Sequence, residues 1–127
     1  LEVEGQSRTL GEWRKQFLIT SPGESLVYLT DFRVEPGSSE WEDLIAWIQG
    51  ADTLICESQY LEQDQSLARK NGHMTALEVG LLGAEAEVGL LELFHLSRRY
   101  GREGWKEQLA EATNQFSRVR FPVNWSL

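Results

Sequence analysis

Short apolar runs typical of strands alternate with longer segments of helical spacing, and this alternation constrains the fold more than any other feature of the sequence. The strand-like runs are 26–29, 53–56, 90–96 and 119–121. The helical segments between them are 39–50, 75–86 and 105–116. Strands that alternate with helices pack as a sheet covered by helices. The sequence therefore predicts a single α/β domain.

Local signals predict where two of these helices begin. Ser39 is a suitable N-cap with Glu42 three residues later, and Thr75 with Glu78 forms a second capping box. Gly50 is expected to end the first helix. Apolar residues of that helix recur on one face, at Trp41, Leu44, Ile45 and Ile48.

A turn signal near the N-terminus predicts a β-hairpin. Ser21-Pro22-Gly23-Glu24 has the residues of a type II turn and separates Phe17–Thr20 from Ser25–Asp31. Because the second of these segments contains the continuous apolar run Leu26–Leu29, we expect that strand to be buried on both faces. Residues 1–16 carry no clear pattern and are expected to be a poorly defined lead-in.

Composition excludes several classes of protein. Twenty acidic against twelve basic residues give a formal net charge of −8, which excludes a strongly basic nucleic-acid module. The one cysteine, Cys56, excludes a disulfide framework and favours the cytoplasm. Because no apolar run approaches 18 residues, we expect no association with a membrane.

Polar residues at the predicted strand ends are the candidate functional residues. Asp31, Glu57 and His95 each close a strand, and His73 lies just before a helix. Chemistry in α/β proteins is concentrated at such ends, and carboxylate and imidazole are ligands for Zn²⁺ or Mn²⁺. Taken singly, each residue also has a common structural role: a turn or cap, a helix start, a solvated strand end, or a partly buried histidine with one hydrogen bond.

The order of four short segments resembles the C-terminal half of ribonuclease Z, the family of tRNA 3′-processing endonucleases with a metallo-β-lactamase fold. The segments are Leu29-Thr30-Asp31, Cys56-Glu57-Ser58-Gln59, Gly72-His73-Met74-Thr75, and Phe94 through Tyr100. The resemblance runs from about Leu18 to Phe121. It implies half of an αββα sandwich, with a mixed sheet covered by helices, and makes residues 1–127 the C-terminal half of that domain.

The same resemblance implies a role for each matching residue. Asp31 would be a bridging metal ligand and His95 a terminal ligand, with two zinc ions in the complete fold and manganese as an alternative. Glu57 and His73 would orient each other and manage the leaving-group proton, with Thr75 in support. The phosphate of an RNA or other phosphodiester substrate would meet Arg98, Arg99 and Tyr100.

The sequence departs from the family in ways that affect the expected activity. Cys56 and Gln59 replace the first His and the Thr of a His-Glu-Ala-Thr segment, and Met74 replaces a Ser. The His-x-His-x-Asp-His segment that supplies most metal ligands is absent. Since a catalytic zinc needs about three protein ligands, we expect this chain alone to be inactive and to need a partner half.

A non-catalytic interaction or dimerisation module with a decayed metal site is the alternative. Helices on one side of the sheet would leave an apolar face that requires cover, by the other half-fold or by a second copy of the chain. A homodimer is then expected. The candidates for the uncovered face are Leu26, Val27, Leu29, Leu54 and Ile55.

Overall fold

A four-stranded parallel sheet forms the centre of the fold, in a computed structural model that describes residues 2–3, 5–19 and 21–125. The elements follow in the order β1 (Glu2–Val3), β2 (Gln6–Ser7), α1 (Leu10–Phe17), β3 (Leu26–Leu29), α2 (Ser39–Ile48), β4 (Thr53–Glu57), a 3-10 turn η1 (Glu62–Asp64), α3 (Gln65–Asn71), α4 (Ala76–Glu85), β5 (Leu90–Phe94), α5 (Gly101–Gln115) and β6 (Val119–Arg120). The predicted α/β class is confirmed.

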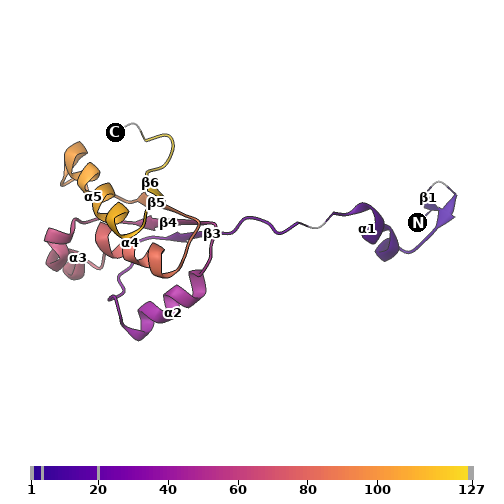
Figure 1. Ribbon diagram of the computed structural model, residues 1–127, viewed down its shortest axis with the longest axis horizontal. Helices are drawn as coiled ribbons and strands as arrows, with labels where there is room; N and C mark the ends of the chain where they lie inside the picture. Colours follow the sequence, from indigo (N-terminus) through magenta and orange to yellow (C-terminus); the bar gives the residue numbers. More distant parts are fainter. Residues whose placement is uncertain (1, 4, 20, 126–127) are drawn as a thin grey trace.

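The strand order and connections determine which face of the sheet the helices cover. The sheet runs β3-β4-β5-β6 with every neighbouring pair parallel, whereas the resemblance predicted a mixed sheet. Each connection includes a helix, because parallel neighbours require a crossover. Crossovers of one hand between sequential neighbours place their helices on the same side. Figure 1 shows α2, α4 and α5 gathered beside the strands in one body.

Side chains alternate along the strands between a covered face and an open face. The covered face carries fully buried Leu54, Cys56, Leu91 and Leu93, which pack into one core with residues of α2, α4 and α5. The open face, as we call the other side of the sheet, carries Leu26, Tyr28, Ile55, Leu90 and Phe94. Leu26 is 63% exposed and Tyr28 is 50% exposed.

Two predictions about β3 are therefore wrong. The strand is not buried on both faces, because its outward residues Leu26 and Tyr28 have no helix above them. Of the five candidates for the uncovered face, only Leu26 and Ile55 lie on it. Val27, Leu29 and Leu54 face the helices instead, because successive residues of a strand point to opposite sides.

The predicted N-terminal hairpin is also wrong. Phe17 is the last residue of α1, and β3 pairs in parallel with β4 along one edge. Leu18 and Ile19 are exposed and follow the helix without joining the sheet, while Thr20 lies outside the described residues. The register of β3 comes from the distant strand β4, and the turn residues next to it do not set it.

Helix caps match the prediction closely. Thr75 caps α4 and Glu78 completes the capping box. The cap of α2 is Ser38, one residue before the predicted Ser39, because the Ser38 hydroxyl accepts the hydrogen bond from the Trp41 amide. Gly50 follows that helix at a φ of 70°, a conformation that suits glycine.

The N-terminal residues form structure that the sequence analysis did not predict. β1 and β2 pair antiparallel, and a complete capping box of Thr9 and Glu12 begins α1. This Thr-x-x-Glu pattern was a readable signal. Figure 1 shows these elements standing away from the α/β body at the end of an extended segment. Among the helices of the described residues, none has the length and apolar character needed to cross a membrane.

Candidate active site

The parallel sheet brings the predicted site residues to one edge. Asp31 lies two residues beyond β3, Glu57 is the last residue of β4, and His95 directly follows β5. His73 comes from the segment between α3 and α4 and reaches the same edge. The carboxyl ends of parallel strands face the same way, and this explains how residues 64 positions apart in the sequence meet.

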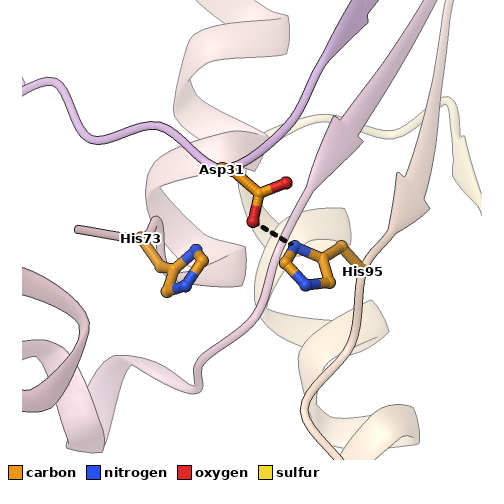
Figure 2. Close-up of side chains that lie close together, drawn as sticks. All are labelled: Asp31, His73 and His95. Carbon is orange, nitrogen blue, oxygen red and sulfur yellow. Dashed lines mark ion pairs between the residues drawn. The ribbon is translucent and has the colours of Figure 1, made fainter. Parts of the chain in front are cut away.

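Asp31, His73 and His95 form a compact cluster (Figure 2). Each offers one ligand atom, and these atoms all lie within 4.8 Å of one another. An Asp31 carboxylate oxygen is 3.7 Å from Nδ1 of His95. The imidazole rings of His73 and His95 meet edge to face with centroids 5.3 Å apart. One carboxylate and two imidazoles at this spacing are a suitable ligand set for a borderline transition metal.

The backbone is strained at two of these three positions. Asp31 has a φ of 53° and His95 a φ of 52°, and Glu87 is the third non-glycine residue among those described with a positive φ. Left-handed conformations are unfavourable for residues with a Cβ. Such strain persists where the surrounding structure enforces it, and it is concentrated at functional sites. Both candidate metal ligands therefore share an unusual backbone geometry.

Glu57 lies behind His73 and is fully buried. One of its carboxylate oxygens accepts the Phe32 amide at 2.7 Å, and the other is 2.8 Å from Nδ1 of His73. Because a carboxylate only accepts hydrogen bonds, Nδ1 carries the proton in this contact and Nε2 keeps its lone pair. A carboxylate that fixes the tautomer of a histidine in this way is typical of metal ligands and of catalytic acid–base groups.

The surroundings of His95 fit a metal ion. Its Nδ1 atom is buried and has no hydrogen-bond partner among the described residues. Buried polar atoms nearly always have a hydrogen bond, so a ring nitrogen that lacks one and lies 3.7 Å from a carboxylate oxygen is suitably placed for a metal ion. On the other side of the ring, Nε2 lies 3.1 Å from the side-chain nitrogen of Gln59. Sequence reasoning missed this contact, because Gln59 was noted only as a replaced Thr.

Thr75 has a structural role in the chain as described. Its hydroxyl accepts the Glu78 amide at 3.3 Å and donates to a Glu62 carboxylate oxygen at 2.7 Å. Glu78 in turn accepts the Thr75 amide at 2.9 Å. These bonds fix the first turn of α4 and hold the segment that carries His73. The described hydrogen bonds of Thr75 are thus to Glu62 and Glu78, and none joins it to Asp31, His73 or His95.

The predicted phosphate-binding residues lie in the turn after His95 and outside the cluster. Arg98 and Arg99 are exposed, and Arg99 lies 3.9 Å from an Asp64 carboxylate oxygen. The Tyr100 hydroxyl donates to Asp64 at 2.5 Å and accepts the Leu61 amide. Burial, together with the hydrogen bond to Asp64, raises the pKa of Tyr100 to about 12. The tyrosine thus ties the turn to η1.

Cys56 precedes Glu57 but takes no part in the cluster. Its side chain lies on the covered face and is fully buried. Burial and the neighbouring Glu57 charge raise the pKa of this thiol well above its usual range. A thiol that stays protonated is a poor metal ligand and a poor nucleophile. Cys56 therefore acts as a core residue.

Comparison with known proteins gives related sequences and related folds. No protein-family model matches the sequence. The chain is 37% identical over 125 residues to ribonuclease Z of Deinococcus radiodurans, a match that covers 98% of this chain and 37% of that protein. It is 35% identical over 117 residues to ribonuclease Z of Nocardia farcinica, covering 92% of this chain and 34% of that one. The chain thus spans about a third of the length of these curated relatives.

Solved structures give the same result at the level of the fold. The metallo-β-lactamase fold protein YhfI from Bacillus subtilis superposes with a TM-score of 0.64 and 28% identity, over 78% of this chain and 37% of that one. Human tRNase Z, short form, superposes with a TM-score of 0.51 and 24% identity, over 61% of this chain and 29% of that one. The predicted resemblance is confirmed: the chain is similar to ribonuclease Z over about a third of those proteins and shares the fold of metallo-β-lactamase proteins.

Proposed function

We propose that residues 1–127 are the C-terminal part of a metal-dependent phosphodiester hydrolase of the ribonuclease Z type, which processes tRNA or another RNA. The cluster of Asp31, His73 and His95 at the carboxyl edge of the sheet, with Glu57 behind His73, supports this proposal most directly. It occurs in a chain that is 37% identical to a ribonuclease Z.

Asp31 and His95 are the proposed metal ligands, with zinc as the first candidate and manganese as the second. The unpaired Nδ1 atom of His95 and the exposed carboxylate of Asp31 fit such an ion. When bound, two metal ions would polarise the phosphoryl group and make a water molecule nucleophilic near neutral pH. Asp31 is suited to bridge two ions because its carboxylate has two oxygens.

His73 and Glu57 are the proposed proton-transfer pair. The buried carboxylate of Glu57 holds Nδ1–H of His73 and orients the ring. In this arrangement the lone pair of Nε2 can take up a proton from water, and the resulting imidazolium can give that proton to the leaving oxygen, since an imidazole gives and takes protons near neutral pH. The exposed guanidinium groups of Arg98 and Arg99 are proposed to contact RNA phosphates.

The chain alone supplies too few ligands for a two-metal site. Asp31 and His95 leave each ion short of the three protein ligands that are usual for catalytic zinc. We therefore propose that polypeptide outside residues 1–127 completes the site, and that the isolated chain does not hydrolyse phosphodiesters. The free, buried Cys56 fits a reducing compartment such as the cytoplasm.

Metal binding and hydrolysis test this function separately. The chain is titrated with Zn²⁺ in competition with a chromophoric chelator, and it is then combined with the polypeptide that supplies the remaining ligands and assayed on a model phosphodiester. Asp31→Ala and His95→Ala are expected to lower metal affinity and abolish hydrolysis. His73→Ala is expected to abolish hydrolysis with a smaller effect on metal affinity. Full activity in Asp31→Ala or His95→Ala would show that the assignment is wrong.

The open face favours a second candidate, an interaction or dimerisation module. Leu26 and Tyr28 are exposed on it, and Trp125 lies over Phe94 at a centroid distance of 6.3 Å while still 39% exposed. An apolar face of this kind marks a contact surface. A chain that binds no metal and self-associates through this face would support the second function over the first.

A further inference from the structure

We propose that Arg33 is a positioning residue that holds Asp31 and His73 in one geometry by joining the segment after β3 to the start of α4. This role goes beyond the residues that the family resemblance assigns. It rests on the proposed metal-dependent function for its consequence, but the geometry itself is testable without any metal.

Arg33 makes hydrogen bonds to three parts of the chain. One guanidinium nitrogen donates to the carbonyl of His73 at 3.3 Å and to a Glu78 carboxylate oxygen at 2.5 Å. The other terminal nitrogen donates to Glu35 at 2.7 Å. The planar fork of arginine suits such a bridge, because its donors point in fixed directions. A single side chain thus bonds to its own segment, to the His73 backbone and to α4.

The ion pair with Glu78 is buried. The side chain of Arg33 is 13% exposed and that of Glu78 is 2% exposed. A buried carboxylate requires a partner, and Glu78 has no other cationic partner among the described residues. The bridge is therefore strongly favoured once the fold has formed, and its loss would leave Glu78 uncompensated.

Two independent contacts connect the segment after β3 to His73. Glu57 accepts the Phe32 amide and also the His73 ring, and Arg33 holds the His73 carbonyl. Asp31 is adjacent to Phe32, has a side chain that is 66% exposed, and keeps a positive φ. Its position depends on how its neighbours are anchored, because its own side chain makes few contacts. Arg33 therefore fixes both residues relative to each other.

Three variants separate positioning from folding. Arg33→Met removes the bridge but leaves Glu78 unpaired. The double variant Arg33→Met with Glu78→Gln removes the buried charge as well, while the amide oxygen of the introduced glutamine can still accept the Thr75 amide. Arg69→Met is the matched control, since Arg69 also pairs with Glu35 but is half exposed and contacts neither His73 nor Glu78.

The metal-free readouts are amide exchange at Phe32 and the imidazole resonances of His73, in the full chain 1–127. The resonances are simple to assign because the chain has only two histidines. Arg33→Met and the double variant are expected to speed Phe32 exchange about tenfold and to shift the His73 signals. The double variant is expected to recover part of the lost resistance to urea. Arg69→Met is expected to change none of these.

Metal affinity is the functional readout. Partners that orient metal ligands typically change affinity by about 10–100-fold, and we expect a loss in this range for Arg33→Met and for the double variant. The proposal is overturned if both variants match Arg69→Met in Phe32 exchange and His73 resonances. If the resonances and exchange change while wild type, combined with the polypeptide that supplies the remaining ligands, binds no metal, Arg33 keeps its positioning role and the proposed function fails.

Discussion

At the scale of single residues, two strand-end positions combine candidate metal-ligating side chains with an unfavourable backbone. Asp31 and His95 both follow strands that pair with β4, and both have φ values near 50°. The turn at the carboxyl end of each strand aims the side chain across the edge of the sheet, toward its counterpart. The geometry that brings the ligands together thus requires conformations in which glycine would be more stable.

This strain predicts an inverted order of stability at Asp31. Both Asp31→Gly and Asp31→Ala remove the carboxylate, but we expect the glycine variant to be more stable by about 1 kcal/mol, because alanine keeps the left-handed strain. The free energy of unfolding is measured with urea. At Glu87, which has a φ of 52° and lies outside the cluster, the glycine variant should again be more stable than the alanine variant. At Glu107, within α5, the alanine variant should be the more stable. Equal stability of the two Asp31 variants would contradict the prediction.

Gln59 gives a second prediction at this scale. Its amide nitrogen can only donate, so in the contact described Nε2 of His95 accepts and Nδ1 carries the proton. A metal at Nδ1 needs the other tautomer, which Gln59 can support by turning its amide over. We expect long-range ¹⁵N spectra to show Nδ1–H in the metal-free chain and Nε2–H after Zn²⁺ is added. In metal-free Gln59→Leu we expect a mixture of the two His95 tautomers, while the His73 signals stay unchanged. Identical His95 spectra in metal-free wild type and Gln59→Leu would contradict this prediction.

At the scale of elements, the crossing of α4 and α5 depends on one glycine. A Cβ on Gly80 would lie 2.6 Å from the carbonyl oxygen of Ala112, so backbone would have to move. At Gly83, one turn further along α4, the nearest atom is a flexible Leu91 methyl at 3.3 Å. The two helices can approach closely because Gly80 lacks a side chain.

Gly80→Ala is therefore expected to destabilise the chain, although alanine is the better helix former. We expect a loss of roughly 1–3 kcal/mol from overpacking, against a gain of about 1 kcal/mol in helix propensity. Gly83→Ala is the matched control and should be clearly less harmful. Urea unfolding at equal protein concentration measures both, and a Gly80→Ala protein as stable as wild type would disprove the close approach.

The elements also show what the sequence could and could not predict. Caps such as Thr75 with Glu78 were predicted because both partners lie within one turn of helix. The predicted hairpin was wrong because an apolar run beside a turn, such as Leu18 and Ile19, does not determine which strand it pairs with. Strand ends and motif order predicted Asp31, Glu57, His73 and His95 as site residues, and the fold brings these four side chains to one edge of the sheet. Arg33 was missed because its partner Glu78 lies 45 positions away, and no local pattern records that contact.

At the scale of the whole molecule, the covered and open faces of the sheet differ sharply. Helices cover one side, which carries the buried core, while the other side exposes Leu26 and Tyr28 on β3 and carries an ion pair of Arg120 with Glu92 on β6 and β5. A sheet of this kind is stable when both faces are covered. The chain spans about a third of its curated relatives, so polypeptide beyond residues 1–127 or a second copy of the chain has a surface on which to pack.

The isolated chain is accordingly expected to self-associate through the open face. We expect sedimentation to give an average mass that rises with concentration, and the pair Leu26→Lys with Tyr28→Lys to restore the monomer, because lysines on the sheet oppose contact between two apolar faces. The pair changes the net charge from −8 to −6, so weaker association cannot result from greater overall repulsion. Trp47→Lys is the matched control, since Trp47 is 70% exposed but lies on α2. A wild-type chain that stays monomeric at every concentration, or a Trp47→Lys chain that dissociates equally, would place the contact elsewhere.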